Sequence, residues 1–315
     1  MKHVQTVVRD AEAAGPGIRR LTLMDPDGWT LPRARPGAHI DLYLPGGLSR
    51  SYSLCGDPAQ TDRYVVAVKR EGDGRGGSAW LHDTLAIGDT LGVSLPRCTF
   101  PLAADAAEHV FVAGGIGVTP FLPLAMAAER AGTPWRLHLL HRDAPPPLAD
   151  LLAPLLDSGR ATLHDTARHP RPALSALLGD APAPPGRHAY CCGPAGMIAA
   201  FEAATADWPL GTAHVEHFVA PPLPPNPAAR PFTLVLARSG REAALPAGAP
   251  LLPAIRALGA EVESSCEGGI CSACRVRWLE GPPLHHDRIL SPAEREREVM
   301  VCVAGCAGPR LVLDL

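Results

Sequence analysis

Four cysteines near the carboxyl end constrain this chain more than any other feature of its sequence. Cys266, Cys271 and Cys274 follow the spacing C-x4-C-x2-C, and twenty-seven residues separate Cys302 from the third of them. This is the spacing of plant-type [2Fe–2S] ligands, in which four thiolates hold two irons. We therefore expect these four cysteines to be the metal ligands of a [2Fe–2S] cluster.

Two glycines inside this loop, Gly268 and Gly269, support the assignment. Without Cβ atoms they permit a tight turn and let backbone N–H groups point at the cluster sulfurs. The alternative is a structural zinc site, which usually presents two short C-x2-C hooks in a tetrahedral arrangement. Only Cys271 and Cys274 form such a hook, so the spacing favours two irons over zinc.

The fourth ligand has a rival, because Cys306 lies only four residues beyond Cys302. Cys302 stands in the apolar run 299–303, as a ligand carried by a strand would. We therefore expect Cys302 to bind the cluster and Cys306 to be a small buried residue without a role in it.

The bulk composition sets the remaining limits. At 315 residues the chain is long enough for two or three domains. Hydrophobic residues make up 46% and charged residues 19%, as in a globular protein, and the formal net charge of −3 favours neither nucleic acid nor a membrane surface as partner. The amino terminus has no signal-peptide pattern and no stretch is apolar for long enough to span a membrane, so we expect a cytoplasmic protein.

The order of apolar patterns predicts three domains. Residues 1–102 contain short alternating runs separated by Gly and Pro, typical of a small antiparallel β-barrel. Residues 103–220 alternate apolar strands with helical stretches, which indicates an α/β domain with a parallel sheet. The proline-rich stretch 221–229 predicts a stiff linker, and residues 230–315 form a small α+β domain around the cysteine loop. The clearest predicted strands are 18–23, 38–44, 64–68, 110–113, 137–140, 189–192 and 232–236, with a helix at 250–258.

The first domain carries residues suited to a flavin nucleotide. Tyr52 offers a flat face to a ring, and Ser53 can form hydrogen bonds to the ring edge. Arg50, Lys69 or Arg70 can carry the charge of a phosphate. The run Gly76, Gly77 and Ser78 can open a helix whose N–H groups bind an anion.

The second domain carries two glycine-containing turns that follow predicted strands. Residues 112–120 open a helix where a pyrophosphate binds, although Pro120 stands in place of the third glycine of the dinucleotide fingerprint. In the second turn, 191–197, Cys192 and Gly193 lie at the carboxyl end of their strand. Buried packing is the alternative role for Cys192.

With these segments in order, the chain resembles the phthalate dioxygenase reductase family, including the vanillate demethylase reductases. The resemblance lies in residues 50–54, 76–78, 114–120, 192–194, 216–218 and the terminal cysteine loop. It implies an oxidoreductase that carries FMN, accepts NADH and ends in a β-grasp-like ferredoxin domain that feeds a Rieske-type oxygenase.

The resemblance also implies roles for individual residues. Those expected to contact the flavin or its phosphate are Arg50, Tyr52, Ser53, Gly76, Gly77 and Ser78. Phe218 corresponds to an aromatic residue that lies against the flavin. Those expected to face the pyridine nucleotide are Gly115, Gly117 and Thr119, with Cys192 near the nicotinamide.

This combination predicts that electrons pass from NADH through FMN and the cluster to an oxygenase acting on an aromatic compound, by ring hydroxylation or O-demethylation. Residues 141–143 hold both a partner for a 2′-phosphate, Arg142, and a carboxylate that would repel one, Asp143, so NADPH stays an alternative. Two other functions are open at this stage. One is an FAD-containing reductase of a different oxygenase, and the other is a redox-sensing interaction protein that binds metal only to fold.

Overall fold

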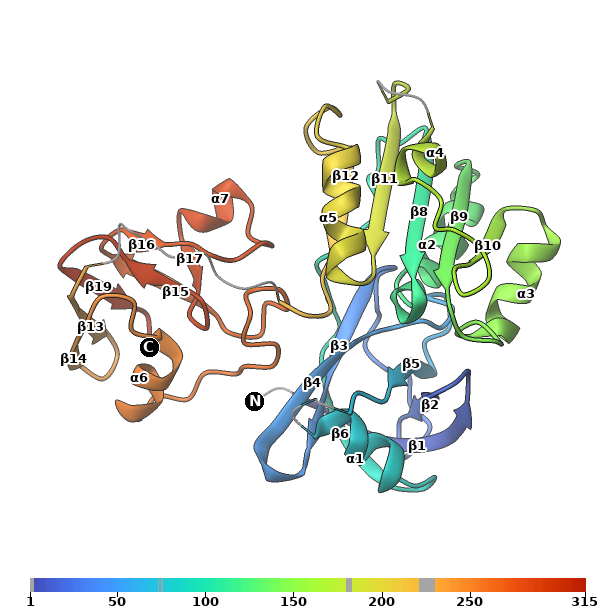
Figure 1. Cartoon of the computed structure of the whole chain (residues 1–315). Coiled ribbons are helices and arrows are strands. Elements are labelled where there is room, and N and C mark those ends of the chain that lie inside the picture. The colour runs from blue at the N-terminus through green and yellow to red at the C-terminus, as the bar shows by residue number, and fades with distance from the viewer. Residues whose placement is uncertain (1–2, 73, 75, 180–182, 221–229) are drawn as a thin grey trace. The chain divides into compact units, whose positions relative to one another are not determined.

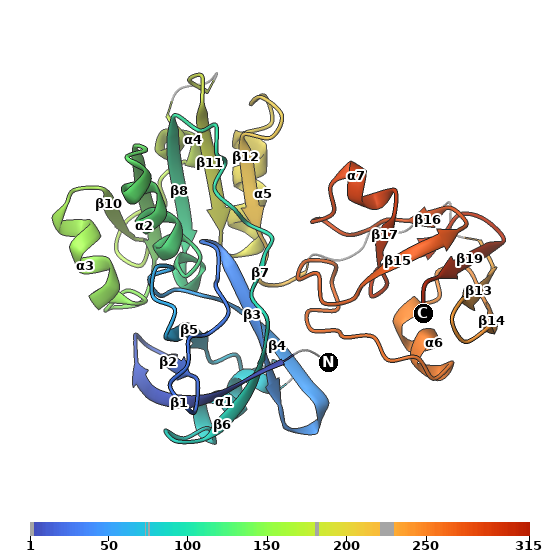
Figure 2. The ribbon, with the colours of Figure 1, turned by 180° about the vertical axis from the view of Figure 1, so that it is seen from behind.

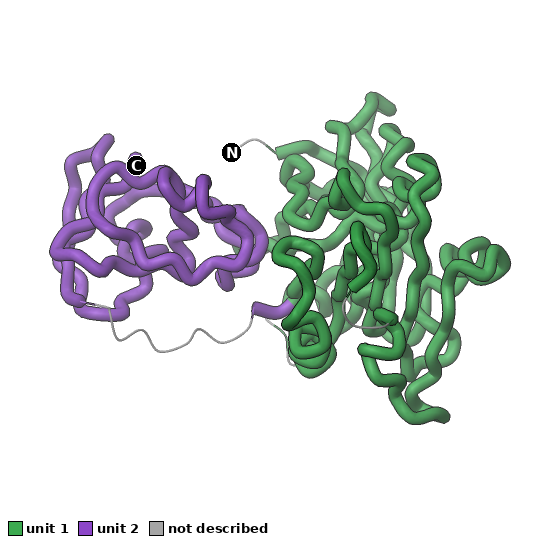
Figure 3. Tube along the Cα trace, turned by 90° about the horizontal axis from the view of Figure 1, so that it is seen from above, with its two compact units in different colours: residues 1–218 green, residues 219–315 purple. Residues whose placement is uncertain are grey.

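The computed structural model divides the chain into two compact units, residues 1–218 and residues 219–315 (Figure 1 and Figure 3). The described residues are 3–72, 74, 76–179, 183–220 and 230–315. The predicted linker 221–229 lies outside them. Among the described residues, no helix is long and apolar enough to cross a membrane.

The amino-terminal strands of the first unit form one antiparallel sheet in the order β4-β3-β6-β1-β2-β5, with β7 beside β3. Their bounds are β1 His3–Ala13, β2 Ile18–Met24, β3 Ala38–Leu44, β4 Leu48–Ser53, β5 Arg63–Lys69, β6 Thr90–Ser94 and β7 Arg97–Cys98. The two end strands of this order meet again at a bridge between Leu54 and Val66, so the sheet curls into a nearly closed barrel (Figure 2). Alternate residues fill its interior, and α1 (Gly77–Asp83) packs Leu81 against it. The predicted antiparallel barrel is confirmed.

The rest of the first unit is a five-stranded parallel sheet in the order β10-β9-β8-β11-β12. The strands are β8 Glu108–Gly114, β9 Trp135–His141, β10 Ala161–Asp165, β11 Arg187–Cys192 and β12 Ala213–Glu216, and the helices are α2 Phe121–Ala131, α3 Ala149–Asp157, α4 Leu174–Leu178 and α5 Ala195–Ala204. Phe111 and Ala113 of β8 pack in one cluster with residues of α2 and α3, whereas Val110 and Val112 pack with residues of α4 and α5. Burial on both faces explains why these strands read as continuous apolar runs.

The strand order creates a switch point between β8 and β11. From β8 the chain moves outward to β9 and β10, and it then returns to place β11 on the other side of β8. In open parallel sheets, ligands bind beyond the carboxyl ends of the strands at such a point.

The barrel and the parallel sheet are tied together inside the first unit. Arg20 of β2 forms an ion pair with Asp150 of α3 at 2.5 Å. The backbone N–H of Leu148 donates to the carbonyl of Ala14 at 2.8 Å. The residues expected to bind flavin and nucleotide therefore belong to one compact body.

The second unit is a mixed sheet in the order β14-β13-β19-β15-β17 with a small β16–β18 ladder. Its strands are β13 Phe232–Leu236, β14 Arg241–Leu245, β15 Arg275–Glu280, β16 Pro283–Leu284, β17 Glu298–Met300, β18 Gly305–Cys306 and β19 Arg310–Leu313, and its helices are α6 Leu251–Ala257 and α7 Pro292–Arg295. Leu251 and Ile255 of α6 pack in one core cluster with Leu234 and Leu311 of the sheet. The predicted α+β domain is confirmed.

One local expectation in this unit was wrong. Cys302 does not lie on a strand, because β17 ends at Met300 and the chain turns there. The N–H groups of Val303 and Ala304 both donate to the carbonyl of Met300, at 3.1 and 3.0 Å, and these bonds close the turn that presents Cys302.

Three histidines lie side by side on β8, β11 and β12. His109 is opposite His188 in the β8–β11 ladder, and Nδ1 of His188 lies 3.0 Å from Nε2 of His214. Burial, reinforced by the neighbouring His188, lowers the pKa of His109 and of His214 from 6.5 to about 4. The folded chain therefore keeps both imidazoles neutral.

We predict that the free energy of unfolding of the first unit falls as the pH falls from 6.5 to 4. In this window the unfolded chain protonates these imidazoles and the folded chain does not, so acid favours unfolding. Urea unfolding at pH 7 and pH 5 measures the loss, and the His109→Asn variant should show a smaller one. Replacement of the exposed His169 by Asn is the control, and equal losses in all three proteins would contradict the prediction.

Candidate functional site

The turn after β8 is shaped by its glycines. A 3-10 turn, Gly115–Val118, leads directly into α2, and Gly115 adopts a positive φ of 55°. A Cβ atom added to Gly117 would lie only 2.3 Å from the carbonyl oxygen of Cys192. Thr119 is buried and donates from Oγ1 to the carbonyl of Ile116 at 3.1 Å. Gly117 thus lets this turn press against the end of β11.

The turn after β11 makes the matching contact. A Cβ atom added to Gly193 would lie 3.0 Å from the Cα of Gly114, and α5 begins two residues later at Ala195. The amino ends of α2 and α5 therefore follow neighbouring strands at the switch point. Free N–H groups at helix starts bind the pyrophosphate of dinucleotides in such a place.

The predicted flavin residues gather on β4 and at the start of α1. A Cβ atom added to Gly77 would lie 2.8 Å from Cγ of Arg50, so the arginine side chain crosses the first residue of the helix. The residue before the helix, Gly76, has a positive φ of 81°, which favours glycine. Ser78 accepts at Oγ from the backbone N–H of Glu71 at 3.1 Å.

Two further flavin candidates differ in their surroundings. Tyr52 is partly buried, and this burial raises the pKa of its hydroxyl to about 12, so the phenol stays protonated. Lys69 lies at the end of β5, where its Nζ forms an ion pair with Glu71 at 3.2 Å. The structure therefore brings Arg50, Gly77 and Ser78 together and gives Lys69 a carboxylate partner nearby.

The barrel and the parallel sheet meet at Glu216, the last residue of β12. Ser53 of the barrel donates from Oγ to its carboxylate at 3.4 Å, and the Cys192 thiol is also hydrogen-bonded to it. Burial raises the pKa of Glu216 to about 8 and the pKa of Cys192 well above its usual value. Three polar side chains from β4, β11 and β12 are thus joined by hydrogen bonds at one place.

Sequence reasoning gave Glu216 no role, although it stood in a segment that carried the resemblance. One sequence signal could have identified Glu216. It is a carboxylate at the end of a parallel strand, and the carboxyl ends of parallel strands meet at one edge of a sheet, where Cys192 also lies. Phe218 lies two residues beyond β12 and is 42% exposed.

The four predicted metal ligands meet as two pairs. The thiols of Cys266 and Cys271 are hydrogen-bonded to each other, as are those of Cys274 and Cys302. This bonding lowers the pKa of Cys266 to about 6 and lowers that of Cys274, while it raises those of their partners.

Two thiol pairs suit two irons better than one zinc ion. A structural zinc ion needs its four ligands around a single point. By contrast, two thiol pairs offer one pair to each of two irons. The thiol of Cys306 instead donates to the carbonyls of Gly308 and Arg310, each at 3.4 Å.

Backbone amides around the loop point at these sulfurs. The N–H of Gly268 donates to Sγ of Cys266 at 3.4 Å, and the N–H of Ile270 donates to the same sulfur. The amide of Gly269 donates to Cys302. Amide donors to sulfur are one of the means by which proteins tune iron–sulfur clusters, so the loop fits a cluster as well as the ligands do.

Comparison with known proteins agrees with this geometry. Residues 234–306 match the family model of the 2Fe-2S iron-sulfur cluster binding domain. The chain is 38% identical to the phthalate dioxygenase reductase of Burkholderia cepacia, over 93% of this chain and 91% of that one. This chain belongs to the phthalate dioxygenase reductase family. It is also 43% identical to the phenoxybenzoate dioxygenase subunit beta of Ectopseudomonas oleovorans, over 89% of this chain and 87% of that one.

A solved phthalate dioxygenase reductase matches 99% of this chain and 98% of its own, with 35% identity and a TM-score of 0.72. That protein is described as a modular structure for electron transfer from pyridine nucleotides to [2Fe–2S]. As a member of the phthalate dioxygenase reductase family, the present chain is an electron-transfer oxidoreductase with a carboxyl-terminal iron–sulfur domain. The predicted family, fold class and cluster-binding domain are confirmed.

We predict that Gly117→Ala impairs NADH oxidation by at least about tenfold, because the added methyl group would separate the turns after β8 and β11. The iron–sulfur absorbance should stay unchanged, since the cysteine loop lies in the other unit. Gly196→Ala is the matched control, because a Cβ atom there meets nothing within 4 Å. Steady-state kinetics with ferricyanide would contradict the prediction if both variants behaved alike.

Proposed function

We propose that this reductase oxidises NADH through bound FMN and passes the electrons singly through its [2Fe–2S] cluster to a Rieske-type oxygenase that acts on an aromatic compound, by ring hydroxylation or O-demethylation. The observation that carries the proposal is the meeting of Ser53, Cys192 and Glu216, because it joins the candidate flavin strand to the candidate nucleotide turn. Relatives such as the phenoxybenzoate dioxygenase subunit beta support an oxygenase as the acceptor.

The residues present fit a flavin mononucleotide. Arg50 would bind the phosphate beside Gly76, Gly77 and Ser78, and Tyr52 would lie against the ring. The phosphate site offered by Gly76, Gly77 and Ser78, together with the family to which the chain belongs, favours FMN over FAD. A flavin bound there supplies the conversion between a two-electron donor and a one-electron acceptor.

The side chains at the junction would position the reacting rings without carrying charge. With its pKa raised to about 8, Glu216 is mostly protonated at pH 7, and Cys192 stays a neutral thiol. We propose Ser53 and Cys192 as the groups that border the flavin and the nicotinamide, with Glu216 holding both. Phe218 would cover the flavin from the end of β12.

Nucleotide binding is assigned to the turns after β8 and β11. Gly115, Gly117 and Thr119 would face the pyrophosphate, with Gly193 allowing the close approach of the second turn. Asp143, exposed after β9, would repel a 2′-phosphate, so NADH is the proposed donor.

We predict that Cys271→Ser abolishes or cripples the cluster and leaves flavin binding and NADH-dependent ferricyanide reduction intact. The ligand set is in the second unit, whereas the proposed hydride-handling residues are in the first. Cys306→Ser is the matched control, because this buried thiol donates to backbone carbonyls and belongs to neither thiol pair. Iron and labile sulfide analysis of the variants and the wild type measures the cluster content. One zinc ion and no labile sulfide in the wild type would refute the assignment of a [2Fe–2S] cluster.

A fragment of residues 1–220 tests the proposed division of labour. It should release FMN on heating, oxidise NADH and reduce ferricyanide, because it holds every proposed hydride-handling residue. It should fail to reduce a Rieske oxygenase or cytochrome c, since electrons leave through the cluster. Equal transfer to the protein acceptor by the fragment and the full chain would contradict the relay, and release of FAD would contradict the flavin assignment.

A further inference from the structure

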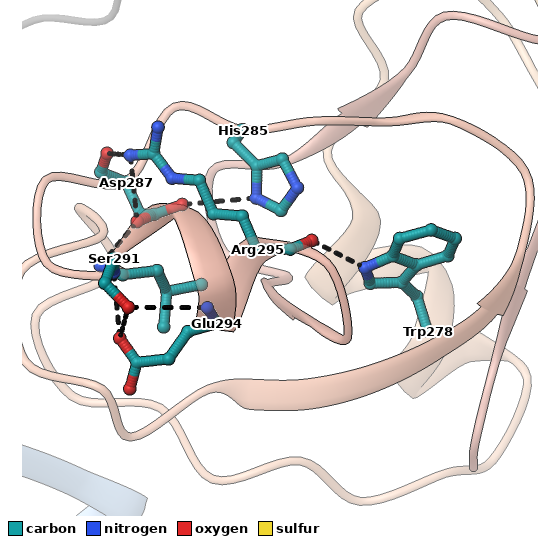
Figure 4. A network of polar contacts seen from close by, with 7 residues as sticks. Trp278, His285, Asp287, Ser291, Glu294 and Arg295 are labelled. Atoms are coloured by element: carbon teal, nitrogen blue, oxygen red, sulfur yellow. Dashed lines mark hydrogen bonds and ion pairs between the residues drawn. The ribbon is translucent and has the colours of Figure 1, made fainter.

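A buried carboxylate, that of Asp287, belongs to a network of polar contacts in the second unit (Figure 4). The side chain of Asp287 is only 1% exposed and accepts from the backbone N–H of Leu290 at 2.9 Å. Arg295 forms an ion pair with it at 3.3 Å and also donates to the carbonyl of Asp287 at 2.7 Å. Nδ1 of His285 lies 3.5 Å from the other carboxylate oxygen. One oxygen of the buried carboxylate is thus paired with Arg295, and the other faces the imidazole of His285, whose pKa is lowered by burial.

Arg295 is itself held in place by the short helix α7. Ser291 and Glu294 form a capping box at its start, with hydrogen bonds of 3.3 and 2.8 Å between each side chain and the other residue's backbone N–H. At its end, Nε1 of Trp278 on β15 donates to the carbonyl of Arg295 at 3.0 Å. The ion pair is therefore anchored to the central sheet of this unit (Figure 4).

The backbone of Asp287 supports the glycine turn of the cluster loop. Gly269 has a positive φ of 71°, and a Cβ atom added to it would lie 3.0 Å from Cα of Asp287 and 2.8 Å from Cγ2 of Val303. The N–H of Arg288 donates to the carbonyl of Gly269 at 3.2 Å. Gly269, whose amide donates to Cys302, is thus packed against Asp287 on one side and Val303 on another.

Stability alone gives little reason for a charged group at this place. Removing a carboxylate from water carries a desolvation penalty that an ion pair often only offsets, and an apolar pair of similar volume can be as stable. What the ion pair adds is directional. Its hydrogen bonds fix residues 287–290 against α7, and the residue after Asp287, Arg288, bonds the carbonyl of Gly269 in the cysteine loop.

We propose that Asp287, held by Arg295 and by the backbone N–H of Leu290, is a positioning residue for the iron–sulfur cluster, and that it sets the turn at Gly269 whose amide bonds the Cys302 sulfur. The proposal rests on the cluster assignment above. Amide donors stabilise the extra negative charge of a reduced cluster, so a loosened turn makes the cluster harder to reduce and easier to lose.

The test compares Asp287→Asn, Arg295→Met and Arg295→Lys in the full chain with the wild type. Arg238→Met is the control, because it removes an exposed ion pair with Asp314 in the same unit. The readouts are the midpoint potential from a titration followed by electron paramagnetic resonance, the signal shape, and the rate of cluster loss to a chelator.

Asp287→Asn and Arg295→Met should show a more negative potential, a changed signal and about tenfold faster cluster loss, a typical effect of altering outer-shell partners. Arg295→Lys should retain part of the wild-type behaviour, and ferricyanide reduction should stay unchanged in all variants. Potentials and loss rates equal to those of Arg238→Met would overturn the proposal. If Asp287→Asn does not fold, the comparison of Arg295→Met with Arg295→Lys tests the proposal. Equal midpoint potentials in these two variants would overturn the proposal. A wild type without labile sulfide would instead refute the cluster assignment, which separates the two failures.

Discussion

The close contact between the turns after β8 and β11 is the constraint on which the first unit depends. Gly117 and Gly193 allow two backbone segments to approach to distances that no Cβ atom would permit. This contact fixes the start of α2 and α5 beside one another and places Cys192 opposite Glu216 in the β11–β12 ladder. Because Ser53 donates to that same carboxylate, the barrel is fixed to the sheet at the place where the two proposed cofactors would meet.

Much of this arrangement could be predicted because it depends on local patterns. Alternating runs and continuous apolar runs located strands of both sheets of the first unit. In the second unit, β13 begins and ends at the predicted residues, Phe232 and Leu236. The four cysteines were proposed as ligands from their spacing alone, and the structure brings their thiols together as two pairs. The turn at Cys302 was missed because an apolar run does not reveal where backbone hydrogen bonds leave the ladder.

Two other features of the candidate sites could not be predicted from the sequence, because they depend on the tertiary structure. Ser53 and Glu216 are 163 residues apart in sequence and meet only because the barrel packs on the sheet. The Asp287 network was likewise invisible, since its contact with Gly269 depends on how the segment before α7 returns to the cysteine loop. Both cases involve a carboxylate shielded from water, one partly buried with its pKa raised to about 8 and the other buried and paired with Arg295. We propose for each that the carboxylate positions neighbouring groups and does not react itself.

The central claim is that one chain collects electrons in pairs in its first unit and releases them singly from its second. An anaerobic titration of the purified full chain with NADH, followed by visible absorbance and electron paramagnetic resonance, tests it most directly. The account predicts that complete reduction takes about three electrons per chain, two at the flavin and one at the cluster. An end point at about two electrons, with no paramagnetic cluster signal, would contradict it.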